Sequence, residues 1–65
     1  MLELYSRVRI TTDRFLEEDN VPAGAVGYII ECYPDGNYEV EVSDDNGVTV
    51  GQFVATETDL KPAPL

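Results

Sequence analysis

The 65-residue chain contains no histidine and no tryptophan, and Cys32 is its only cysteine. One cysteine cannot form a disulfide within the chain, and without histidine it cannot complete a structural zinc site. A nucleophilic cysteine also needs a base to activate it, and the chain has no histidine for that role. The acidic stretches lack the alternating ligands and closing glutamate of a calcium loop. We therefore expect no metal, no cofactor and no enzymatic activity, with Cys32 as an inert, core-facing thiol.

Basic residues are scarce as well: four Lys and Arg stand against thirteen Asp and Glu, for a net charge of −9. Nucleic acids and anionic membranes are bound mainly through Lys and Arg, so this balance argues against both as partners. The high negative charge either serves solubility alone or attracts a basic protein. The start of the chain resembles no signal peptide, and no apolar run approaches the roughly 20 residues of a membrane span. These features favour a cytoplasmic protein.

The length allows one domain, spanning residues 1–65, with a thin core. Val8 and Ile10 share one parity while Arg7 and Arg9 share the other, which predicts a strand over 7–11. The acidic segment 12–23 follows. A helical turn within it would be too short to predict as a helix, so we expect a long loop whose Phe15 or Leu16 packs back onto the core.

The middle of the chain predicts a hairpin of two strands, 24–33 and 37–43. Pro34-Asp35-Gly36 fits a type I turn followed by a left-handed glycine, which gives a three-residue loop with a bulge at Gly36. The resulting register pairs Cys32 with Tyr38, Glu31 with Glu39 and Ile30 with Val40. One face, expected in the core, then holds Val26, Tyr28, Ile30, Cys32, Tyr38, Val40 and Val42. The solvent face holds Ile29, Glu31, Tyr33, Glu39 and Glu41.

The last third of the chain predicts two further strands. Asp44-Asp45-Asn46-Gly47 indicates another hairpin turn, followed by a strand over 48–55. Its apolar residues change parity, so we infer a bulge near Gly51 that brings Val50 and Phe53 to the same face. One helical turn is expected at 56–60. A short last strand is expected at Lys61–Pro62. Pro62 and Pro64 exclude a central strand because proline has no amide donor, so this tail lies at an edge or is frayed.

These elements describe an all-β, small SH3-like barrel of about five antiparallel strands, with a long first loop and a one-turn 3-10 helix before the last strand. Five motifs carry a more specific resemblance: Val8-Arg9-Ile10, Pro22 to Gly27, Asn37 to Val42, Asp45-Asn46-Gly47, and Asp59-Leu60-Lys61-Pro62. With these the chain resembles, over residues 7–62, the small bacterial proteins grouped as domain of unknown function 4926. It departs from them in the acidic segment 12–20 and at Gly51-Gln52. The resemblance implies a fold and no activity, because none is established for the group.

A looser similarity of fold exists to SH3-like accessory proteins of larger enzymes, such as the small stromal SH3-like protein of photosystem I and the variable chain of ferredoxin–thioredoxin reductase. Both act by docking. This likeness is an analogy, since fold alone does not determine function.

The candidate binding residues are Glu31, Tyr33, Glu39 and Glu41 on the solvent face and Glu17, Glu18 and Asp19 in the long loop. We expect a non-enzymatic binding module that engages a basic protein partner through these side chains. The alternative is an accessory subunit that docks onto a larger enzyme or electron-transfer complex. A face that is merely solvated stays open too. So does a homo-oligomer, because Ile29, Tyr33, Leu2 and Leu4 would add exposed apolar surface.

Overall fold

The computed structural model describes all 65 residues and contains a five-stranded antiparallel sheet. In chain order the elements are β1 (Arg7–Ile10), α1 (Leu16–Asp19), β2 (Val26–Cys32), β3 (Tyr38–Ser43), β4 (Thr49–Ala55), the 3-10 turn η1 (Glu57–Asp59) and β5 (Leu60–Pro62). The strand order is β4-β3-β2-β1-β5, and no ladder joins β4 to β5, so the sheet is open. The all-β fold is confirmed, and its topology is compatible with an SH3-like barrel.

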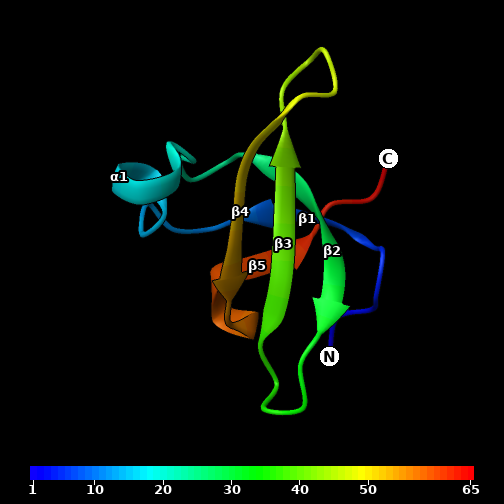
Figure 1. Ribbon diagram of the computed structural model, residues 1–65. Helices are drawn as coiled ribbons and strands as arrows, with labels where there is room; N and C mark the ends of the chain where they lie inside the picture. Colours follow the sequence, from blue (N-terminus) through cyan, green and yellow to red (C-terminus); the bar gives the residue numbers. More distant parts are fainter.

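The core lies between two groups of strands. Figure 1 shows β2, β3 and β4 running side by side along the length of the molecule, while β1 and β5 cross them. A cluster of 11 buried apolar residues fills the space between, and every strand contributes to it. Its largest completely buried side chains are Ile10, Ile29, Val8, Val21 and Val40. Each contributes about 1.5 to 3 kcal/mol, a large share of the stability that so small a domain can reach. No helix has the length and apolar character that a membrane span requires.

The β2–β3 hairpin has the turn that its sequence predicts. The Gly36 amide donates to the Tyr33 carbonyl at 3.1 Å, and the Tyr33 amide donates to the Asn37 carbonyl at 2.9 Å. Gly36 has a φ of +90°, a conformation that glycine adopts without steric cost. Cys32 then pairs with Tyr38, as a three-residue loop requires. Cys32 is half-buried and packs against the core.

The predicted register fails beyond Glu31, because Ile30 forms a bulge. Val40 lies opposite Ile29 and not opposite Ile30. The extra residue shifts the rest of β2 by one position, and such a shift exchanges the two faces of a strand. The expectation that Tyr28 and Ile30 line the core and that Ile29 faces solvent is therefore wrong. Ile29 is completely buried, Tyr28 is 47% exposed, and Ile30 and Val26 are half-buried.

Close packing of β2 against β3 accounts for this change of face. In the shifted register Gly27 points inward, and a Cβ there would lie 2.6 Å from the Glu41 carbonyl oxygen. Only glycine fits at that point of the inner face. The bulge that follows lets Ile29 enter the core, while Tyr28 stays on the outer side of the strand.

A second bulge lies in β4 near Gly51, close to where the sequence predicts it. Val42 pairs with Gly51 and Ser43 with Thr49, which leaves Val50 without a partner. Val50 is 45% exposed, so the expectation that it shares a face with the buried Phe53 is wrong. Gly51 takes the inward position because the chain after α1 crosses it there. A Cβ on Gly51 would lie 2.7 Å from a methyl carbon of Val21.

The connection between β1 and β2 is long, as predicted, but it contains the short helix α1. Phe15 is buried at the start of this helix and stacks on Phe53 with the ring centroids 3.9 Å apart. Leu16, the other residue considered for this packing, is 43% exposed. The helix ends at Asn20, which has a left-handed conformation with φ of 57°.

The end of the chain follows the sequence prediction closely. The helical turn is η1, and β5 pairs only with β1, so it lies at an edge of the sheet. Pro62 sits opposite Val8 in this edge strand, where the missing proline amide removes no ladder bond from a central strand. The strands β1 to β4 begin or end slightly inside the predicted ranges, and β2 starts at Val26.

Candidate binding face

The outward surface of β2, β3 and β4 carries most of the candidate residues. Glu31, Glu39 and Val54 form one row of paired residues across it, and Tyr28, Glu41 and Gln52 form another. Paired residues on neighbouring strands point to the same side of a sheet. The residue between Glu39 and Glu41 in sequence is inward and buried, so these rows face solvent. We call this surface the acidic face: Tyr28, Glu31, Tyr33, Glu39, Glu41, Gln52 and Val54.

Tyr33 belongs to the acidic face through a hydrogen bond. Its hydroxyl group donates to Oε1 of Glu39 at 2.7 Å. This bond, together with desolvation and the neighbouring carboxylates, raises the pKa of Tyr33 above its ordinary value. Tyr33 therefore stays protonated throughout the neutral range, and its neutral hydroxyl group orients the Glu39 carboxylate.

The glutamates of this face have no cationic partner within the molecule. Glu31 and Glu39 lie directly opposite each other on β2 and β3. Like charges in this arrangement repel, although water and salt screen most of the cost at a surface. The chain forms two ion pairs, Met1 with Glu57 and Arg14 with Asp59, and neither involves the acidic face. Glu31 is exposed, Glu39 and Glu41 are half-buried, and none of the three carboxylates is paired with a cation of the molecule.

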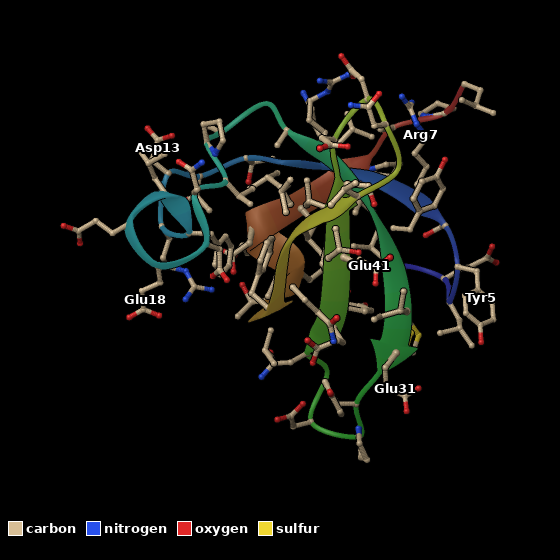
Figure 2. All side chains as sticks on the ribbon, turned by 45° about the horizontal axis from the view of Figure 1, so that its top comes forward. Tyr5, Arg7, Asp13, Glu18, Glu31 and Glu41 are labelled. Carbon is tan, nitrogen blue, oxygen red and sulfur yellow. The ribbon has the colours of Figure 1, made fainter.

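The other three candidates, Glu17, Glu18 and Asp19, lie in α1, and we call them the α1 group. This helix packs beside β4 on a different flank of the molecule from the β2–β3 hairpin. Figure 2 shows Asp13 and Glu18 around α1, Glu41 over the middle of the sheet and Glu31 near the hairpin end. The structure therefore divides the predicted residues into two separate groups. Only the acidic face combines its carboxylates with exposed tyrosines.

A comparison with protein families assigns the chain to a known group. The model of the family described as Domain of unknown function (DUF4926) matches residues 4–62, which is most of the chain. The chain belongs to this family. The resemblance carried by the strand and turn motifs is thus confirmed, and the family description gives no activity. No curated protein and no solved structure matches the chain.

The free cations of this DUF4926 domain lie together at another part of the sheet. Arg7 of β1 pairs with Tyr28, and Arg9 pairs with Lys61 of β5. The two arginines each donate to a backbone carbonyl at 2.8 Å. Figure 2 places Arg7 at the end of the molecule away from Glu31. Three of the four basic residues are therefore grouped on β1 and β5, and Arg7, as the partner of Tyr28, adjoins the acidic face on the same side of the sheet.

Asp59 is the buried carboxylate of the domain, and its bonds are structural. It accepts hydrogen bonds from the Thr56 amide at 2.8 Å and the Thr56 hydroxyl at 3.0 Å, and it pairs with Arg14. Burial alone would raise the pKa of Asp59, but the bonds from Arg14 and Thr56 outweigh burial and lower it. The hydrogen bond to Asp59 likewise raises the pKa of Arg14. This carboxylate caps η1 and ties it to the segment before α1.

Glu57 has a similar structural role at the start of the chain. It accepts a hydrogen bond from the Tyr38 hydroxyl at 2.8 Å, and its other oxygen lies 3.4 Å from the terminal ammonium group of Met1. Both contacts lower the pKa of Glu57. The Tyr38 hydroxyl in turn accepts from the Leu2 amide at 3.1 Å. These contacts tie the first residues to β3 and η1 and leave Glu57 outside the acidic face.

Tyr28, Gln52 and Val54 are members of the acidic face that the sequence does not predict. Tyr28 is predicted in the core because the pattern of β2 does not reveal the bulge at Ile30. The alternation of Phe53 and Ala55 with Gln52 and Val54 is the signal that identifies the outward residues of β4. The surface has no pocket, and no group of three potential metal ligands is assembled on it.

Proposed function

We propose that this protein is a non-enzymatic binding module of the bacterial cytoplasm that engages a basic protein partner through its acidic face. One observation carries the proposal: three neighbouring glutamates without an internal counter-ion share an outward sheet surface with two exposed tyrosines. The ionisable groups with shifted pKa values that lie elsewhere are engaged in structural bonds, which supports binding in preference to catalysis.

The arrangement suits a charged partner surface in two ways. Residues two apart on a strand are separated by about 6.8 Å, so Glu39 and Glu41 can meet different Lys or Arg side chains. Tyr28 and Tyr33, which are 47% and 38% exposed, add rigid contact area with polar tips. Long-range attraction would speed encounter, and salt would weaken it.

Two triple variants with the same net charge test the proposal. The first neutralises the acidic face, as Glu31→Gln, Glu39→Gln and Glu41→Gln. The second neutralises the α1 group, as Glu17→Gln, Glu18→Gln and Asp19→Asn. The wild type should capture a basic protein from a lysate of its host at low salt and release it at high salt. With the purified partner, the first variant should bind about tenfold more weakly, from about 0.5 kcal/mol per exposed ion pair, and the second should bind like the wild type.

Three outcomes would contradict the proposal. Equal losses in both variants would mean that only net charge matters. Undiminished binding by the first variant would exclude the acidic face as the site. A partner that stays bound at high salt would indicate a permanent apolar interface, as expected for an accessory subunit of a larger enzyme.

A further inference from the structure

Tyr5 has a backbone conformation that is unusual for an aromatic residue. Its φ is +65°, in the left-handed region. The other positive-φ positions of the chain are occupied by Gly24, Gly36, Gly47 and Asn20, which are the residue types that tolerate this region. Tyr5 alone combines the left-handed conformation with a bulky side chain.

The local structure holds Tyr5 in this conformation. The Ser6 amide donates to the Glu3 carbonyl at 3.2 Å, which closes a turn with Tyr5 at its third position. The Ser6 hydroxyl donates to the same carbonyl at 2.6 Å. The Tyr5 amide donates to the Ile29 carbonyl at 2.7 Å and fixes the turn against β2. Glycine would satisfy every one of these backbone bonds with less strain.

The ring of Tyr5 contributes little to the fold that would offset this strain. Tyr5 is 72% exposed, the largest exposure among the four tyrosines, and its hydroxyl forms no hydrogen bond within the molecule. Figure 2 shows the ring projecting outward from the flank of the molecule. Backbone strain at an exposed side chain is typical of residues placed for binding.

Tyr5 also lies beside the acidic face. Its backbone is bonded to Ile29, two residues before Glu31 on β2. Figure 2 shows Tyr5 and Glu31 on the same flank. A cation that approaches Glu31 from solvent therefore finds an exposed aromatic ring at the margin of that face.

We propose that Tyr5 is an aromatic anchor at the margin of the acidic face and that its ring receives an arginine guanidinium group of the basic partner. The inference rests on the proposed function and adds a named residue and a preferred partner side chain. A guanidinium group binds an aromatic face within about 6 Å of the centroid, and a nearby carboxylate reinforces its charge. The same molecule shows this contact internally, where the Arg14 guanidinium carbon lies 4.5 Å from the Phe15 ring centroid.

The test uses two synthetic peptides, one with five arginines separated by glycines and one with lysines in their place. Tyr5→Phe keeps the ring. Tyr5→Gly and Tyr5→Asn remove it and suit the left-handed backbone, so both should melt no lower than the wild type. The wild type and Tyr5→Phe should bind the arginine peptide equally and more tightly than the lysine peptide. The two ring-free variants should bind the arginine peptide about two- to fivefold more weakly and lose the preference for it. NMR shifts of the Tyr5 ring should move on titration with the arginine peptide.

The results that overturn the inference differ from those that overturn the proposed function. Equal binding by the wild type and the ring-free variants would remove Tyr5 from the site while the acidic face still stands. Weak binding by Tyr5→Phe would show that the hydroxyl, and not the ring, is recognised. Sedimentation that reveals a wild-type dimer lost in Tyr5→Gly would assign the ring to a second copy. If the wild type binds neither peptide and no basic partner, the proposed function itself fails.

Discussion

Replacing Asp59 by Asn should destabilise the domain strongly although the two side chains have nearly the same shape. The Asp59 carboxylate has only 12% of its side-chain surface exposed and accepts two hydrogen bonds from Thr56 while it pairs with Arg14. All three bonds converge on Oδ2, so an asparagine carbonyl can take its place, but as a neutral acceptor it forms weaker bonds and loses the ion pair with Arg14. Bonds to a charged acceptor are worth about 1.5 to 3 kcal/mol and neutral ones about 1 kcal/mol. We expect a loss of about 2 kcal/mol, or a Tm lower by about 8 to 16 °C in a domain of this size.

The pH dependence of this effect follows from the lowered pKa of Asp59 in the folded state. Its ordinary value is 3.8, so the unfolded chain takes up the proton at a higher pH than the folded protein does. The stability contributed by the charged carboxylate is therefore complete above that value and is lost as the pH falls through the lower, folded-state pKa. Urea unfolding between pH 7 and pH 3 should show the wild type converging on Asp59→Asn at the acid end.

Asp45→Asn is the matched control, because Asp45 is exposed in a turn and its side chain makes no hydrogen bond or ion pair. It should leave the Tm within about 4 °C of the wild type, as expected for a surface change below about 0.5 kcal/mol. A stability of Asp59→Asn equal to that of the control, or a gap from the wild type that widens toward low pH, would refute the reasoning about the η1 cap.

Three further substitutions have definite expected outcomes. Gly27→Ala would place a Cβ 2.6 Å from the Glu41 carbonyl oxygen, and we expect thermal unfolding to show a loss of about 2 to 3 kcal/mol. Phe15→Ala removes a buried ring stacked on Phe53, and urea denaturation should show a free energy of unfolding lower by about 3 to 5 kcal/mol. A decrease below about 1 kcal/mol would mean that α1 is not anchored to the core. Glu39→Gln should lower the pKa of Tyr33 toward its ordinary value of 10.0 in an ultraviolet titration. The hydrogen bond to the Glu39 carboxylate is the largest cause of the raised pKa of Tyr33, and this substitution removes the charge of its acceptor. An unchanged titration curve would contradict the 2.7 Å contact.

The elements that could be predicted from the sequence are those determined by local chemistry. Pro34-Asp35-Gly36 specifies its turn through the fixed φ of proline and the freedom of glycine, and the first two β2–β3 pairs follow from it. Pro62 confines the last strand to an edge for an equally local reason.

The bulge at Ile30 could not be predicted in the same way, because its cause lies in other strands. Gly27 packs against the backbone of β3, and Ile29 exchanges hydrogen bonds with Tyr5 and Ser6 of the N-terminal segment. Neither contact is reflected in the order of apolar and polar residues within β2. A prediction based on period-two patterning therefore assigns Tyr28 to the core, where it does not lie.

The candidate site likewise has one part that local sequence determines and another that depends on contacts between distant segments. Glu31, Glu39 and Glu41 could be placed on one face because the turn determines their alignment near the hairpin end. The separation of the α1 group from this face depends on the packing of Phe15 against Phe53, which is a contact between distant segments. The role inferred for Tyr5 depends on a backbone angle that no residue pattern reveals.

The placement of Tyr28 on the acidic face depends on the bulge at Ile30, and a pair of alanine variants tests that bulge most directly. Chemical denaturation of Ile29→Ala and Ile30→Ala would measure which isoleucine fills the core. We expect a loss of about 3 kcal/mol for Ile29→Ala, because Ile29 is completely buried, and a clearly smaller loss for Ile30→Ala, because Ile30 is half-buried. A larger loss for Ile30→Ala would return Tyr28 to the interior and contradict the composition of the acidic face.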